Sequence, residues 1–122
     1  MTLYRTEIIE RYRFPRHRGA IKNPHAQAEK VNAFCGDEIA LFLRLGDGGM
    51  RVAEVRFDGQ GCALMTASAD ILCEAVQGKT CDAVKQFSAE DLLVLYGEAP
   101  TPGRLKCVLL PYEALKSAVS LI

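Results

Sequence analysis

Asp58-Gly59-Gln60-Gly61-Cys62-Ala63 is the stretch that decides the fold, because it joins two different regular elements. The half-apolar run Val52 to Phe57 precedes it and predicts a strand, while the amphipathic run Leu64 to Gln77 follows it and predicts a helix. The two glycines permit a sharp turn with positive φ and a close backbone approach. The sequence therefore predicts a strand that turns sharply into a helix.

Cys62 stands at the mouth of that helix, where unpaired N–H groups and the positive end of the helix dipole favour an anion. A thiolate is such an anion, and this placement lowers the pKa of a cysteine. The alternative is a small thiol buried in a strand–helix turn, since free cysteine is among the most buried residue types. This turn alone leaves both interpretations open.

Composition excludes several functional classes. A chain of 122 residues can bury a substantial core, so we expect residues 1–122 to form a single domain. Its 15 basic and 15 acidic residues balance, which gives no electrostatic case for binding nucleic acid or an anionic membrane. The apolar runs are too short to span a bilayer. Acidic Glu7 interrupts the N-terminal segment before any apolar stretch forms, so no signal peptide is expected.

The cysteines indicate a reducing environment. There are five, an odd number, in a chain without an expected export signal. We therefore expect free thiols and a cytoplasmic protein. The sequence contains no CxxC pair, so neither a zinc ribbon nor a thioredoxin-like motif has support.

Upstream of the turn, alternating apolar residues predict a β-hairpin. Ile39 to Leu45 places every second residue on one face, and Gly46 to Gly49 follows as a turn. A short third strand is expected at Val31 to Ala33, after an extended connection over Ala20 to Lys30. In the returning strand, the residues expected to share one face are Ala53, Val55 and Phe57.

Helical periodicity flanks the hairpin. We expect an N-terminal helix over Leu3 to Tyr12, with Tyr4 and Ile8 on the same apolar face as Tyr12. In the helix after the turn, the side opposite the apolar arc is expected to consist of Thr66, Asp70, Cys73 and Gln77.

Three further helices are expected. The first runs from Thr80 to about Phe87, and the second is capped by Ser88 and stopped by Gly97. The last runs from about Arg104 to the chain end. Its inward face is expected to carry Cys107, Ala114, Ala118 and Leu121.

Three cysteines lie where a loop meets a regular element: Cys35 before the first hairpin strand, Cys62 after the second strand, and Cys107 at the opening of the last helix. Together with a carboxylate, three thiolates could complete a tetrahedral Zn²⁺ site or hold a cluster by mostly sulfur ligation. The cysteines are scattered, so burial in the core remains an alternative for each of them.

Short motifs extend over nearly the whole chain. They are YRFPRHRG at 12–19, NAFCGD at 32–37, FDGQGCA at 57–63 followed by ASA at 67–69, a Glu74 to Lys79 segment, and RLKC at 104–107. In this order they resemble HYxNPRNxG, NPxCGD, FxGxGCxxxxAS, ExxxGK and RxKC. These are motifs of the U-type iron–sulfur cluster assembly scaffolds, the family of IscU, SufU and the N-terminal domain of NifU.

The resemblance implies a site and a fold. Cys35, Cys62 and Cys107 would be the cysteine ligands and the sulfur acceptors, Cys107 among them, and Asp37 would be a labile carboxylate ligand that helps the cluster leave. The fold would be α/β of the α+β type, a small three-stranded antiparallel sheet packed with four to five helices. The cofactor would be a transient iron–sulfur cluster, expected to be [2Fe–2S], or Zn²⁺. The implied partners are a cysteine desulfurase, an iron donor and apo iron–sulfur proteins.

The chain also departs from the family patterns. Lys106 stands where IscU has histidine, as in SufU, yet the insertion typical of SufU between the second and third cysteines is missing. Ala99 to Gly103 replaces the LPPVK-type loop of IscU. A protonated lysine has no lone pair for a metal, but its charge is expected to favour the Cys107 thiolate. Cys73 and Cys81 match no ligand of the family, and Cys73 is expected at the edge of the helix core.

Three hypotheses about function follow. The favoured one is a scaffold that builds a transient cluster and hands it on. The second is a sulfur acceptor in which Zn²⁺ is held by the same three cysteines and Asp37, working with a cysteine desulfurase. The third is a structural zinc domain without sulfur traffic. The rate of ligand exchange separates these hypotheses. A structural zinc site is closed and should exchange its metal slowly.

Overall fold

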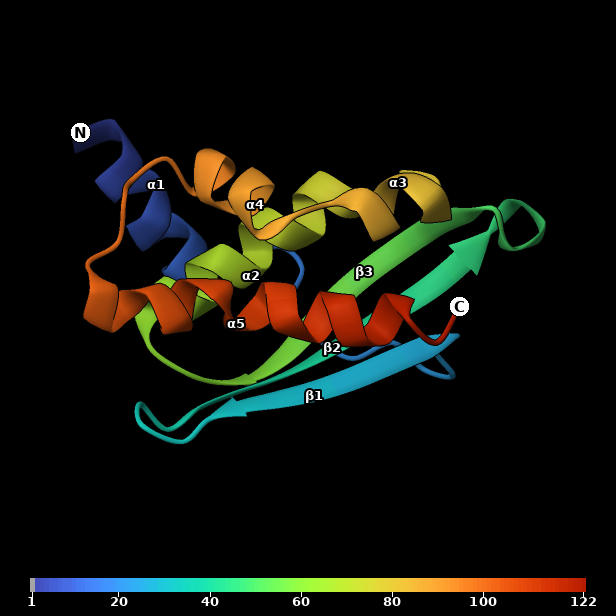
Figure 1. The fold of residues 1–122 in the computed structure, drawn as a ribbon, viewed down its shortest axis with the longest axis horizontal. Coiled ribbons are helices and arrows are strands. Elements are labelled where there is room, and N and C mark those ends of the chain that lie inside the picture. The colour runs from blue at the N-terminus through green and yellow to red at the C-terminus, as the bar shows by residue number, and fades with distance from the viewer. Residues whose placement is uncertain (1) are drawn as a thin grey trace.

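A three-stranded antiparallel sheet forms one layer of the molecule, and helices form the other (Figure 1). The computed structural model describes residues 2–122, with side chains described from residue 6 onward. The strand order is β1-β2-β3. The elements are α1 (Thr2–Arg13), β1 (Ala26–Asn32), β2 (Asp37–Gly46), the 3₁₀ turn η1 (Asp47–Gly49), β3 (Arg51–Gln60), α2 (Ala63–Val76), α3 (Cys81–Gln86), α4 (Ala89–Tyr96) and α5 (Pro102–Val119). The predicted fold class is confirmed.

The core lies between the sheet and the two longest helices. Figure 1 shows α5 running across the sheet, with α2 beside it and packed against it. The sheet contributes a row of buried apolar side chains to this layer: Ile39, Leu41, Leu43, Val52, Val55 and Phe57. None of the described helices is long and apolar enough to cross a membrane.

A β-bulge changes which residues of β3 face the core. Arg44 pairs with Glu54 but the next residue, Leu45, pairs with Val52, so Ala53 is an extra residue between them. An extra residue reverses the alternation of side chains beyond it. Val52 is therefore buried and Ala53 is exposed, and the prediction that Ala53 shares a face with Val55 and Phe57 is wrong.

Helix α2 is buried on nearly all sides. Ten of its residues are buried, among them Thr66, Asp70 and Cys73, which we placed on the side opposite the apolar arc. This side is buried as well, because α1 and the loop after it pack against it. Arg11 of α1 donates to Oδ2 of Asp70 at 2.8 Å, and the backbone N–H of His17 donates to Oδ1 at 2.9 Å. Cys73 is fully buried in the core and does not lie at its edge.

The bounds expected for two further elements are also wrong. The first sheet strand begins at Ala26, so residues 26–30 belong to β1 and not to a connection. Its alternation is weak in the sequence, because the less exposed face of β1 combines Ala26 and Ala28 with the polar residues Lys30 and Asn32. Helix α5 begins at Pro102, where proline at the first position suits a helix start, and it ends at Val119. Leu121 therefore lies beyond the helix and is 66% exposed.

The other helix boundaries follow their caps. Ser88 and Asp91 form a capping box at the start of α4, and Gly97 ends that helix in a left-handed conformation. Thr80 caps α3 as expected. In α1, Ile8 is buried but Tyr12 is 47% exposed, so the expected apolar face is only partly correct. The side chain of Tyr4 lies outside the described residues.

Gly59 holds β2 and β3 together at the end where β3 leads toward α2. Its φ is +136°, and a Cβ there would collide with the backbone oxygen of Glu38. Both features require glycine.

We predict that Gly59→Ala lowers the free energy of unfolding by about 2–4 kcal/mol, because the strain and the collision each cost about 1–3 kcal/mol. Urea denaturation measures this. The matched control is Gly103→Ala in α5, where an added Cβ meets nothing within 4 Å, so it should be neutral or slightly stabilising. Equal effects of the two substitutions would contradict the role of Gly59.

Candidate metal centre

Three separate chain segments meet at one end of the molecule. Cys35 lies in the turn between β1 and β2, and Asp37 is the first residue of β2. Cys62 is the N-cap of α2, as predicted, and Cys107 lies in the second turn of α5. Figure 1 shows the β1–β2 turn and the starts of α2 and α5 at the same end. The fold therefore brings together residues that are up to 72 positions apart.

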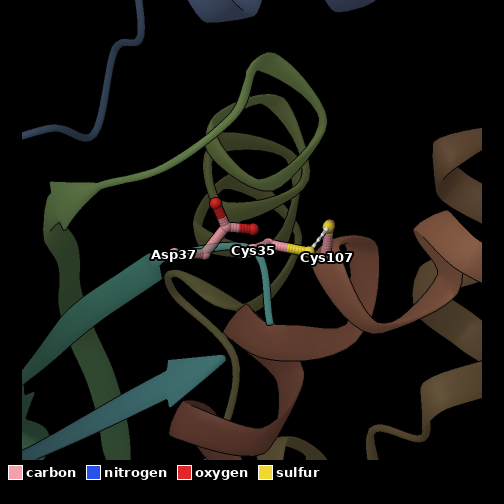
Figure 2. A group of neighbouring side chains, drawn as sticks. All are labelled: Cys35, Asp37 and Cys107. Carbon is pink, nitrogen blue, oxygen red and sulfur yellow. Dashed lines mark hydrogen bonds between the residues drawn. The ribbon is translucent and has the colours of Figure 1, made fainter. Parts of the chain in front are cut away.

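The side chains of Cys35, Asp37 and Cys107 point toward one another (Figure 2). Their potential ligand atoms all lie within 4.8 Å of one another, and the sulfurs of Cys35 and Cys107 are 3.3 Å apart. Ligands of a tetrahedral zinc ion, bound at about 2.0–2.3 Å, lie roughly 3.3–3.8 Å from one another. The three groups are thus spaced as ligands of one metal ion can be.

Cys62 adjoins this group through Asp37. The backbone N–H of Cys62 donates to Oδ1 of Asp37 at 3.0 Å, and its sulfur lies 3.8 Å from Oδ2. Gly61 makes this approach possible, because a Cβ there would lie 3.1 Å from Oδ1 of Asp37. The second glycine of the turn therefore lets the backbone come close to the carboxylate.

The site is buried on one side and open on the other. Asp37 and Cys107 are each 1% exposed, whereas Cys35 is exposed and Cys62 is half-buried. Asp37 and Cys107 are thus fixed in the protein interior. The thiols of Cys35 and Cys62 remain accessible to a molecule that approaches from outside.

The electrostatics of Cys107 favour a bound cation. Burial raises the pKa of the Cys107 thiol strongly, and hydrogen bonds with Cys35 and Asp37 together with the charges of Cys62 and Asp37 raise it further. All these influences oppose a thiolate in the metal-free protein. A divalent metal ion would supply the missing positive charge and deprotonate the thiol. The donor set therefore fits a thiophilic metal.

Asn32 supports the site, although sequence reasoning did not single it out. It is buried at the end of β1, and its side chain donates to the sulfur of Cys35 at 3.5 Å. Its carbonyl oxygen accepts from the backbone N–H of Phe34 at 3.2 Å. An asparagine that hydrogen-bonds two residues ahead is typical of an Asx turn, and this signal was present three residues before Cys35.

Lys106 points its ammonium group over the ring of Phe34, at 5.4 Å from the ring centre. The activating role that we expect for Lys106 toward Cys107 stays a prediction. Cys73 is buried in the core, and the sulfur of Cys81 lies 3.3 Å from the backbone oxygen of Gly49. Neither cysteine belongs to the group around Asp37.

The structure is thus an α+β domain that gathers three cysteines and an aspartate at one end, a set of donor groups that could hold a metal ion. The family model of the NifU-like N terminal domain matches residues 3–121, so the chain belongs to this family. The family expected from the motifs is thereby confirmed.

Several relatives share the full extent of the domain. The chain is 31% identical to the zinc-dependent sulfurtransferase SufU of Bacillus subtilis, covering 98% of this chain and 90% of that protein. It is 30% identical to the iron-sulfur cluster assembly scaffold protein IscU of Streptococcus pyogenes, covering 96% and 82%. A similar crystal structure is a putative iron-sulfur cluster assembly scaffold protein for the SUF system from Fervidobacterium islandicum, with a TM-score of 0.75, 28% identity and 93% coverage of both chains.

Asp37 has a structural role that can be separated from its charge. We predict that Asp37→Ala lowers the free energy of unfolding of the metal-free protein by about 1–3 kcal/mol, because the backbone N–H of Cys62 loses its acceptor. Asp37→Asn keeps an oxygen at this place and should cost less. Urea denaturation in the presence of a chelator compares the two, and equal losses would contradict the role of Oδ1 as acceptor.

Proposed function

We propose that the protein is an iron–sulfur cluster assembly scaffold. It builds a transient cluster, expected to be [2Fe–2S], on Cys35, Cys62 and Cys107 with Asp37, and transfers it to apo-proteins. The observation that carries this proposal is the convergence of these groups in a site with one open side. Thiolates are the ligands that iron–sulfur clusters use, and an open side is needed for loading and release.

Sulfur delivery requires a donor outside this chain. We propose a cysteine desulfurase that carries a persulfide, as well as an iron donor. The exposed thiol of Cys35 meets such a donor first. As a thiolate it would attack the outer persulfide sulfur, and the desulfurase cysteine would leave as a thiolate. The sulfur of Cys107 is 3.3 Å away, so the acceptor expected from the sequence can be reached through Cys35.

Asp37 would make the cluster transferable. A carboxylate oxygen is a harder ligand than a thiolate and leaves a site of soft donors more readily. Asp37 also accepts a hydrogen bond from the backbone N–H of Cys62. When the carboxylate leaves the metal, it therefore still has a hydrogen-bond partner in the protein. Loss of the cluster would therefore not leave a buried carboxylate without a hydrogen bond.

A zinc-bound sulfur acceptor is the second candidate. It is favoured by Lys106, which cannot be a metal ligand, and by the likeness to a relative named as a zinc-dependent sulfurtransferase. Zn²⁺ on the same four residues would keep the thiols deprotonated at neutral pH. A purely structural zinc domain has less support, because Cys35 is exposed and structural sites are closed.

Cluster transfer distinguishes the two candidates. We predict that the protein, reconstituted without oxygen with iron and a desulfurase, gains visible absorption and passes the cluster to an apo-ferredoxin. Asp37→Asn should retain the cluster longer and transfer it several-fold more slowly, because the amide nitrogen and oxygen are neutral and the exchangeable carboxylate is gone. Absorption of donor and acceptor over time measures both rates.

Cys81→Ala is the matched control, since Cys81 lies outside the site, and it should leave loading and transfer unchanged. A wild-type protein that accepts sulfur with Zn²⁺ bound but never holds a cluster would overturn the scaffold proposal in favour of the second candidate. Faster transfer by Asp37→Asn would show that Asp37 does not act as the labile ligand.

A further inference from the structure

The turn between β1 and β2, residues 33–36, meets α5 at two neighbouring positions. The sulfurs of Cys35 and Cys107 lie 3.3 Å apart (Figure 2). Phe34 and Lys106 are the residues immediately before these two cysteines, and the Lys106 ammonium lies over the Phe34 ring, 5.4 Å from its centre. The second contact therefore spans the same gap between the turn and the helix as the first.

Burial does not explain where the Phe34 ring lies. The residue is 91% exposed, so nearly all of its apolar surface remains in water. Residues 31–34 and α5 together line a cavity of about 440 Å³ beside it, so the turn is not closely packed on the helix. A side chain in this place gains little from the hydrophobic effect. The cation over its face is therefore the interaction that orients the ring.

The turn is ordered internally but attached to α5 at few points. The side chain of Asn32 donates to the sulfur of Cys35, and its backbone oxygen accepts from the N–H groups of Cys35 and Gly36 at 3.3 and 2.9 Å. All of these hydrogen bonds are local to the turn. In the described part of the chain, only the sulfur pair and the Lys106–Phe34 contact join the turn to α5 by a hydrogen bond or a cation–π contact. The second of these involves no metal ligand.

We propose that Phe34 and Lys106 form a clasp that keeps Cys35 beside Cys107 when no metal is bound. The inference rests on the proposed metal-binding function and makes both residues positioning residues that do not touch the metal. The apparent affinity of a site falls with the fraction of molecules in which its ligands are assembled. The clasp raises this fraction by holding the one cysteine ligand that is exposed.

The size of the effect follows from the exposure of the pair. A cation over an exposed aromatic face shifts an equilibrium by a factor of about 2–5. Lys106 has no lone pair to offer a metal, so this contact gives its charge a role at the site that needs no ligation. Loss of either partner should therefore weaken metal binding moderately and leave the ligand set unchanged.

Phe34→Leu tests the clasp without changing any charge near the thiols. In the metal-free protein, a bifunctional thiol reagent that fluoresces when it joins two neighbouring cysteines measures how often Cys35 lies beside Cys107, and mass spectrometry identifies the joined peptides. The rate of this crosslinking should fall about 2–5-fold. Zn²⁺ affinity, measured by competition with a chelator, should fall by a similar factor, because both quantities follow the same assembled fraction.

A double-mutant cycle assigns the effect to the pair. Lys106→Met should also lower crosslinking, and the loss in the double variant with Phe34→Leu should be smaller than the product of the single losses by about 2-fold or more. An effect of the Lys106 charge on Cys107 alone is independent of the ring and cancels in the cycle. Phe34→Tyr and Lys106→Arg keep a ring and a cation, so each should behave like the wild type.

The matched controls replace residues of the same types elsewhere. Phe14→Leu changes another exposed phenylalanine, in the loop after α1, and Lys116→Met changes another exposed lysine of α5. Both should leave crosslinking and Zn²⁺ affinity unchanged. Because Phe34 and Lys106 are exposed, the midpoint of thermal unfolding of the metal-free protein should stay the same in every variant of the pair.

Two results would overturn the inference. One is unchanged crosslinking and Zn²⁺ affinity in Phe34→Leu. The other is a pair of single losses that simply multiply in the double variant, which would show that the ring and the charge act independently. A wild-type protein that binds no Zn²⁺ through its thiols would refute the proposed function instead. The crosslinking cycle would still decide for or against the clasp, because it needs no metal.

Discussion

The hydrogen bond from the backbone N–H of Cys62 to Asp37 is the interaction on which the site depends. It ties the first residue of β2 to the N-cap of α2 at 3.0 Å. A Cβ at position 61 would crowd this approach at 3.1 Å from Oδ1 of Asp37, and glycine at 59 is required for the strand pairing just before it. The hydrogen bond thus holds the Asp37 carboxylate beside the Cys62 thiol. Helix α5 contributes Cys107 to the same group.

The fold keeps this junction rigid from behind while leaving its outer side open. Helix α2 is held in the interior because Arg11 and the backbone of His17 satisfy the buried carboxylate of Asp70. A buried carboxylate without such partners would be strongly destabilising. The Ser68 hydroxyl donates to the backbone oxygen of Val108 at 2.6 Å, which fixes α2 against the helix that carries Cys107. The turn that carries Cys35 lies on the open side, where this cysteine is exposed.

Local sequence signals predicted well where several helices begin and end. They predicted poorly which faces of the strands and helices are buried. Cys62 and Ser88 could be placed because glycines and caps act within a few residues. The bulge at Ala53 leaves no local signal, since it arises from how β2 and β3 pair. Burial of Asp70 depends on α1, whose Arg11 contacts it from 59 residues away in the sequence. Asn32 gains its role only from neighbours that the fold supplies, so periodicity could not identify it.

The central claim is that three cysteines and one aspartate from three chain segments form a single metal centre. X-ray absorption at the zinc edge of the zinc-loaded protein tests it most directly. The account predicts three sulfur ligands at about 2.3 Å and one oxygen at about 2.0–2.2 Å. A shell with fewer than three sulfurs, or with a histidine nitrogen in place of the oxygen, would contradict it.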